Sequence, residues 1–204
     1  LNVEINYSKL IKAIAVASNE ARAVDETLFF CLDQICEFSG WPLGHLYLTA
    51  DNPSEGLVPT QFWHVDKPGQ FETFQKITLE TPLEEGIGLP GRVLISGQPA
   101  WIIDVTKDSN FPRAQLAQDI GVKAGFAFPI LIGTKVLGVM EFFSPNAVEP
   151  DPQMLDIMAQ IGTQLGRVLE RKQAQDESQR SQDQLRKLYH RLEQVREEER
   201  TRTA

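Results

Sequence analysis

Residues Glu85 to Ser144 read EGIGLPGRVLISGQPAWIIDVTKDSNFPRAQLAQDIGVKAGFAFPILIGTKVLGVMEFFS, and this stretch decides the fold. It opens with Gly86 and Gly88, which can adopt a positive φ at little steric cost. Pro90 suits the first turn of a helix, because proline lacks the N–H that would stay unbonded there. We therefore expect a short helix that ends at Gly97, a residue type common just after a helix.

The second half of this stretch predicts a β-hairpin. Two apolar runs, 125–132 and 135–143, are separated by the turn residues Gly133 and Thr134. Both runs are almost continuously apolar, which indicates strands covered on both faces. With a brief strand at 101–103, this pattern predicts an antiparallel sheet with a pocket on one face.

Three segments in this order and spacing carry a resemblance to a known family. GIGLPGRV is followed by GQPAWIIDV and then by AFPILIGTKVLGVMEFFS. Together they resemble a GAF domain, the small-molecule sensory module of signalling proteins, over Tyr7 to Leu169. The resemblance implies an α/β (α+β) fold, with a central antiparallel sheet of about five or six strands and helices on both faces.

The chain before residue 85 adds helices and strands to this sheet. Ser8 can cap a first helix, and a second can begin at Asp25 and end at Gly40. Strands are expected at 44–49 and 57–65. Two helices before the first strand are also how a GAF domain begins.

Two further segments concern the rim of the expected pocket. An additional edge strand is expected at 78–81. The polar loop 104–121, where GAF pockets are roofed, contains the turn Asn110-Phe111-Pro112 and a short helix expected at 113–120.

The C-terminal part of the chain predicts a long helix. We expect a sensory domain at 1–152, with its two N-terminal helices, and a signalling helix or coiled coil at 153–204. Apolar residues recur there at alternating three- and four-residue spacing, as in the seam of a coiled coil: Leu185, Leu188, Leu192 and Val195. The expected partner is a second copy in a parallel homodimer.

The apolar residues of this helix do not share one heptad register. Continuing from Ile161 in heptads misses Leu185 by one position, and such a slip locally changes the winding of a coiled coil. Two interpretations remain open. The middle is either a solvated linker between two dimer patches or a weak segment that can switch register.

The last residues suggest which domain comes next in the parent protein. RLEQVREEERTR, residues 191–202, resembles the approach to the phosphoacceptor helix of one class of sensor histidine kinases. The resemblance implies a downstream kinase domain beyond Ala204 as a partner in the same chain.

Composition excludes several classes of function. The net charge of −8 argues against a nucleic-acid surface, which needs clustered Lys and Arg. There is no apolar run of the roughly 20 residues that a transmembrane helix needs. Cys31 and Cys36 suit small buried apolar residues in a reducing compartment, so we expect a cytoplasmic protein.

No catalytic pattern is visible, so we expect no enzyme in this fragment. The sequence contains no nucleophile elbow, P-loop or metal-ligand spacing. One GAF enzyme, the free methionine sulfoxide reductase, works through cysteines near its pocket. Here Cys31 and Cys36 belong to the second helix, which in the fold lies away from the pocket.

The resemblance also narrows the ligand, and no cofactor is expected. In GAF domains that attach a bilin, the attachment Cys and the His after it would fall on Pro112 and Arg113, which excludes a covalent bilin there. The signature of cyclic-nucleotide GAF domains cannot be placed. His45 and His64 are interpreted as strand-surface residues rather than haem ligands.

The expected site is therefore an aromatic pocket that binds an unknown small molecule. The candidates are aromatic walls, polar groups and the amides that open the helix after Gly88: Trp63, Trp101, Phe111, Phe126 and Phe128; Asp104 and Arg113; Gly91 and Arg92. The alternative is that the aromatic residues only fill a core. If Arg113 contacts ligand, Arg113→Ala should weaken binding and leave the melting temperature nearly unchanged.

These observations together predict a sensory and dimerisation module of a signalling protein. Ligand binding in the pocket would be relayed through the parallel coiled coil to a histidine kinase domain. The alternatives are a ligand-free structural dimerisation module, or a regulator of another output such as a cyclase, phosphatase or transcription factor.

Overall fold

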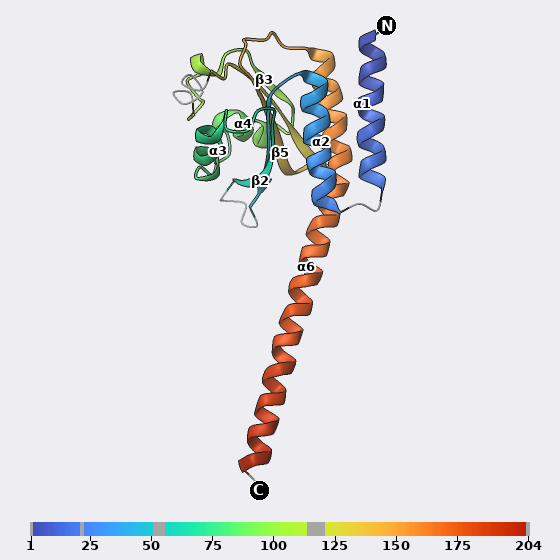
Figure 1. Ribbon diagram of the computed structural model, residues 1–204, viewed down its shortest axis with the longest axis vertical. Helices are drawn as coiled ribbons and strands as arrows, with labels where there is room; N and C mark the ends of the chain where they lie inside the picture. Colours follow the sequence, from blue (N-terminus) through green and yellow to red (C-terminus); the bar gives the residue numbers. More distant parts are fainter. Residues whose placement is uncertain (1, 21–22, 51–55, 114–120, 203–204) are drawn as a thin grey trace. The chain divides into compact units, whose positions relative to one another are not determined.

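The computed structural model describes residues 2–20, 23–50, 56–113 and 121–202 (Figure 1). Its centre is a five-stranded sheet in the order β2-β1-β5-β4-β3. Every pair of neighbouring strands is antiparallel. The strands are β1 Leu43–Thr49, β2 Leu57–Val65, β3 Ala100–Ile102, β4 Ala124–Ile132 and β5 Lys135–Ser144. The expected fold class is thereby confirmed.

Helices cover both faces of this sheet. They are α1 Asn2–Asn19, α2 Val24–Ser39, α3 Glu72–Leu79, α4 Gly88–Ser96 and α6 Pro152–Arg202, with a short 3-10 helix at Val105–Lys107. Figure 1 shows α1, α2 and the start of α6 on one side, and α3 and α4 on the other. We call these the α2–α6 face and the α3–α4 face.

Local sequence signals placed several element ends correctly. Gly133 in the β4–β5 turn has a φ of 58°, and the two strands pair across it from Ile132 and Lys135. Gly97 and Gly40 adopt the left-handed conformation after α4 and α2, as expected. At each position a backbone that favours glycine stops the element.

Other local expectations were wrong. Ser8 lies inside α1, which begins before it. Ala23 occupies the cap of α2, so Asp25 lies in the first turn rather than at the cap. Thr78 belongs to α3 rather than to an edge strand, and Leu83 instead forms an isolated bridge with Leu57. Of the helix expected at 113–120, residues 114–120 lie outside the described residues.

The compact globular unit runs from residue 1 to 168, and a second unit comprises 169–204. The first therefore extends past the boundary expected after residue 152, because the start of α6 has a buried apolar face. Met154, Met158, Ile161 and Leu165 are all buried.

Two glycines let α6 approach the sheet backbone. A Cβ on Gly162 would overlap the carbonyl oxygen of Pro129, and one on Gly166 would overlap that of Leu131. The Gly-x-x-x-Gly spacing places both glycines on the same side of the helix. Helix-to-backbone packing thus explains both residues.

The second unit is helical from Leu169 to Arg202. Leu185, Leu188 and Leu192 are 53%, 55% and 58% exposed in the single chain. The side chain of Val195 lies outside the described side chains. Among the helices that the structure describes, none is both long and apolar enough to cross a bilayer.

Candidate functional site: a buried polar cluster on the α3–α4 face

Strand register brings a set of polar and aromatic side chains to the α3–α4 face. His45 on β1 pairs with Glu141 on β5 and with Trp63 on β2. Tyr47 follows two residues after His45 and therefore lies on the same face. His45, Tyr47 and Glu141 are fully buried within this face.

Arg113 reaches this face from the loop before β4 and forms a two-pronged ion pair with Glu141. Its Nη1 donates to Glu141 Oε1 at 3.0 Å, and its Nη2 donates to Oε2 at 2.8 Å. Nη1 also donates to the hydroxyl of Thr78 on α3, at 2.8 Å. The Arg113 side chain is only 2% exposed, so this geometry is held away from water.

Aromatic rings surround the guanidinium of Arg113. Its Cζ lies 4.6 Å from the ring centroid of Phe74, 5.2 Å from that of Phe111 and 5.5 Å from that of Phe143. Ring faces attract a cation most where water is excluded. We call His45, Tyr47, Trp63, Thr78, Arg113 and Glu141 the polar cluster.

The charges of the polar cluster balance. Burial disfavours the Glu141 carboxylate, but the Arg113 charge outweighs it and holds the pKa of Glu141 below its ordinary value. Burial lowers the pKa of His45 more than its bonds to Glu141 and Thr60 raise it. The folded cluster therefore holds one cation, one anion and a neutral imidazole.

The partners of His45 determine which nitrogen carries its proton. Both ring nitrogens face oxygens that can only accept: Nε2 lies 3.1 Å from the Thr60 carbonyl and Nδ1 lies 3.4 Å from Glu141 Oε1. We assign the proton of the neutral ring to Nε2, because its contact is the shorter one. Both nitrogens are therefore engaged within the protein.

His45 should make folding stability depend on pH. The unfolded chain binds a proton below about pH 6.5, whereas folded His45 resists it because its pKa is lowered. The free energy of unfolding should therefore fall as pH drops from about 6.5 to 5, and His45→Gln should flatten this slope. Protonation of Glu141 should lower the free energy of unfolding further at more acidic pH, because its folded pKa lies below the ordinary carboxyl value. Urea unfolding at a series of pH values measures the slope, and equal slopes in wild type and His45→Gln would contradict the assignment.

Three polar hydrogens of the cluster have no acceptor among the described residues. The Tyr47 hydroxyl, the Trp63 indole Nε1 and the Arg113 Nε are buried without a hydrogen-bond partner in this part of the chain. Trp63 stacks on His45 with ring centroids 3.8 Å apart, and Tyr47 meets the same ring edge-on at 4.6 Å. Unpaired buried donors are uncommon in folded proteins, so this concentration marks a candidate site.

The structure brings three of the residues predicted to bind ligand to this face. Arg113 and Trp63 belong to the polar cluster, and Phe111 is buried in the apolar core beside it. Whether they contact a ligand stays a prediction.

Three other predicted pocket residues lie on the opposite, α2–α6 face. Trp101 pairs with Phe126 across β3 and β4, and its indole N–H donates to the Val148 carbonyl at 2.8 Å. Phe126 stacks on Phe142 at 4.8 Å, and Phe128 lies beside Gly162 of α6. The expectation that these aromatic residues share a pocket with Arg113 is corrected, because they alternate along their strands with Ala100 and Ala127, which share the face of Glu141.

Hydrogen-bond donors near the start of α4 already have acceptors within the chain. The Gly91 amide donates to the Ile87 carbonyl at 3.1 Å, and the Gly88 amide to the Asn110 side chain at 3.1 Å. Arg92 Nη2 donates to Asp108 at 2.6 Å. The Gly91 amide is thus engaged within α4, and the Arg92 side chain joins α4 to the loop. Anion binding by the amides of Gly91 and Arg92 stays a prediction.

Asp104 has a local role as well. Its carboxylate accepts from the amide of Thr106 at 3.1 Å and from its hydroxyl at 2.6 Å, which caps the 3-10 helix. It is therefore a turn residue in this structure.

Sequence reasoning missed most of the polar cluster. His45 was interpreted as a surface residue but is fully buried, whereas His64 lies on the α2–α6 face beside Asp33. Glu141 offered a signal, since it is a lone carboxylate within the apolar strand VMEFF. A buried carboxylate requires a cationic partner, but strand periodicity does not identify which one.

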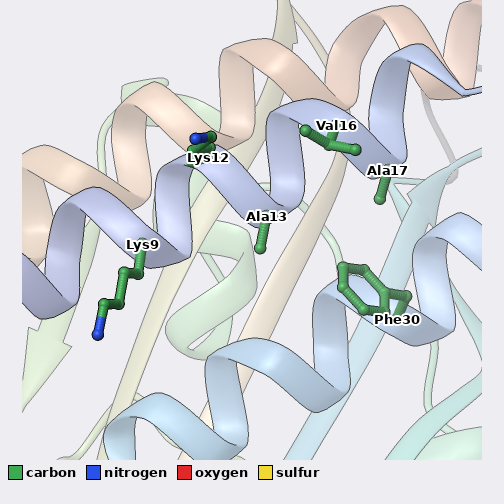
Figure 2. A pocket seen from close by; sticks show the side chains of 6 residues that line it. All are labelled: Lys9, Lys12, Ala13, Val16, Ala17 and Phe30. Atoms are coloured by element: carbon green, nitrogen blue, oxygen red, sulfur yellow. The ribbon is translucent and has the colours of Figure 1, made fainter.

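A surface hollow of about 360 Å³ lies elsewhere, between α1 and α2. Figure 2 shows Phe30 of α2 turned toward Ala13 and Ala17 of α1, with Lys9 and Lys12 further along α1. None of the residues that line it was predicted to bind ligand.

Comparison with known proteins agrees with this architecture. The family profile described as "GAF domain" matches residues 21–170, which is most of the chain. The chain belongs to the GAF domain family. GAF domains are sensory modules of signalling proteins that bind small molecules, and the polar cluster lies within the part of the chain that matches.

Solved GAF structures share the fold at low sequence identity. The nlh2 GAF domain of A. aeolicus in an inactive state is 19% identical, with a TM-score of 0.62 over 83% of this chain and 99% of that one. Free methionine-R-sulfoxide reductase from Neisseria meningitidis, in complex with its substrate, is 18% identical, with a TM-score of 0.63 over 82% and 91%. The GAF domain of a phosphoenolpyruvate-protein phosphotransferase from Coxiella burnetii is 15% identical, with a TM-score of 0.71 over 87% and 99%.

Proposed function

We propose that this chain is the sensory and dimerisation module of a signal-transduction protein. A small molecule binds on the α3–α4 face, and a parallel coiled coil formed by α6 relays the signal to a downstream histidine kinase domain. The single observation that carries the binding part is the set of buried donors without acceptors among the described residues of the polar cluster.

The relay rests on the exposed leucines of α6. Leaving a large apolar side chain in water forgoes about 1.5–3 kcal/mol relative to burial. Leu185, Leu188 and Leu192 are each more than half exposed in the single chain. A second copy aligned in parallel covers this row and directs both chain ends toward the same output.

Two other functions remain as alternatives. The first is a dimerisation module that holds no ligand. The second is a GAF regulator of another output, since one GAF domain of similar structure comes from a phosphoenolpyruvate-protein phosphotransferase. The kinase output rests on the resemblance of residues 191–202 to the approach of a phosphoacceptor helix.

The reductase relative raises an enzymatic alternative that the cysteines disfavour. Cys31 and Cys36 are buried in α2, and both are free thiols. Burial raises the pKa of Cys31 to about 12 and raises that of Cys36 as well. A thiol of such high pKa is a poor nucleophile at neutral pH, so we propose no enzymatic role. Free thiols also suit a reducing compartment, and we propose a cytoplasmic location.

Leu188→Glu with Leu192→Glu should convert the dimer into a monomer and leave the globular unit folded. Four added charges per dimer would face each other across the seam, whereas the buried core of α6 ends before this region. Native mass spectrometry of wild type and variant measures oligomeric state and any retained small molecule together. We expect the same retained mass in both proteins and dimers only in wild type.

The arrangement of the two helices needs its own check. Leu188→Cys should crosslink to its counterpart in the partner chain under mild oxidation, and His190→Cys, also exposed and on the side of the helix away from the seam, serves as a control. A wild-type monomer, or a folded dimer without the Leu188 crosslink, would contradict the parallel seam. A dimer without any bound small molecule would favour the structural alternative.

A further inference from the structure

The unpartnered donors of the polar cluster indicate the kind of ligand that the cluster accepts. The Tyr47 side chain is fully buried and Arg113 is 2% exposed, yet the Tyr47 hydroxyl and Arg113 Nε donate to no described residue. The indole N–H of Trp63 is also buried and donates to no described residue. Burying a donor without an acceptor destabilises the folded protein, and a bound acceptor would remove that cost.

The three donors belong to one site rather than to separate defects. The His45 ring joins two of them, since it stacks on Trp63 and meets Tyr47 edge-on. Glu141 joins the third, because its Oε1 lies near both His45 Nδ1 and Arg113 Nη1. The partly buried ring of Trp63, on edge strand β2, covers His45 on this face.

The charge of this site argues against an anionic ligand. Both terminal nitrogens of Arg113 already bind the Glu141 carboxylate, so the cation is neutralised within the protein. His45 is neutral and adds no positive charge. A phosphate or carboxylate group here would approach Glu141 without gaining a free cation, and buried like charges repel strongly.

Aromatic side chains indicate the shape of the ligand. Phe74 and Phe143 are fully buried against each other and the Arg113 guanidinium. The aromatic surface left for a ligand is the partly buried indole of Trp63, on the face turned away from His45. Flat rings pack favourably on such surfaces. The site therefore combines an aromatic surface with three hydrogen-bond donors.

We propose that the polar cluster binds a neutral, planar heterocycle with a carbonyl acceptor. Tyr47, Trp63 and Arg113 Nε donate to its oxygen and ring acceptors. This inference rests on the proposed sensory function and specifies its ligand class.

Two pairs of probes that differ mainly in charge test the ligand class. Nicotinamide is compared with nicotinate, and uracil with orotate, by isothermal titration calorimetry on the full chain. We expect at least one neutral ring to bind, with an affinity at least tenfold higher than that of its anionic counterpart. A fragment of this size with correct contacts should bind below about 10 mM.

Tyr47→Phe tests the role of the donors, because it should stabilise the free protein and weaken ligand binding. Its hydroxyl has no partner among the described residues of the free protein, so removing it should raise the melting temperature by about 2–4 °C. The same change should weaken binding of the neutral probe about tenfold, because a donor to the ligand is lost. The matched control is Tyr7→Phe, whose hydroxyl donates to Asp151 at 2.8 Å away from the cluster. That control should lower the melting temperature and leave binding unchanged.

Several outcomes would overturn the inference. Tighter binding of the anions, no binding of either neutral ring, or unchanged binding in Tyr47→Phe would each do so. A lower melting temperature in Tyr47→Phe would show that the hydroxyl has a structural partner. Failure of the ligand class leaves dimerisation and any retained mass in native mass spectrometry unaffected, so failure of the proposed function is measured separately.

Discussion

Arg113→Ala should lower the free energy of unfolding by about 3–5 kcal/mol, the cost of breaking a buried ion pair from one side. The change leaves the Glu141 carboxylate fully buried with the neutral His45 beside it. It also removes a hydrogen bond to Thr78 and the packing of the guanidinium among Phe74, Phe111 and Phe143. Urea unfolding at pH 7 measures the loss. The sequence-based expectation of an unchanged melting temperature is thus replaced by its opposite.

A double-mutant cycle separates the ion pair from simple loss of volume. Glu141→Gln alone should also destabilise, because it leaves the Arg113 cation buried. The double change Arg113→Met with Glu141→Leu keeps the volume and removes both charges, so it should recover most of the stability. Lys107→Ala, whose side chain is 83% exposed, is the control and should have little effect. Additive single effects with no recovery in the double variant would contradict the coupling.

Gly162→Ala and Gly166→Ala should each destabilise the globular unit by about 1–3 kcal/mol. Each new Cβ would overlap a backbone carbonyl oxygen of β4, at Pro129 and Leu131 respectively, so the helix or the strand must move. Helix propensity alone predicts the opposite sign, because alanine favours a helix over glycine by about 1 kcal/mol. The sign of the change therefore distinguishes tertiary packing from local preference.

The neighbouring exposed position supplies the control for the glycine variants. Thr163→Ala lies between them on the solvent side of α6 and should be neutral or slightly stabilising. Thermal unfolding of the three variants gives the comparison. Stabilisation by alanine at both glycines would show that α6 does not contact the β4 backbone this closely.

The local signals of the sequence determined the hairpin, the helix ends and the family. Gly133, Gly97 and Gly40 adopt a positive φ where turn and cap chemistry predicted it. The apolar runs of β4 and β5 became strands within about one residue of the expected ends, since period and turn residues act over short distances. Local signals failed at Ser8 and Asp25, where helices α1 and α2 begin earlier than the capping residues suggested.

Only the tertiary structure decided the candidate site. The order β2-β1-β5 places His45 against Glu141, and the loop before β4 brings Arg113 to the same carboxylate. Register likewise sends Trp101 and Phe126 to the face opposite Arg113. A sequence pattern indicates that a residue is apolar or charged and which neighbours share its side of a strand. It does not indicate which distant strand lies beside it, and the partners of a buried charge are set by that arrangement.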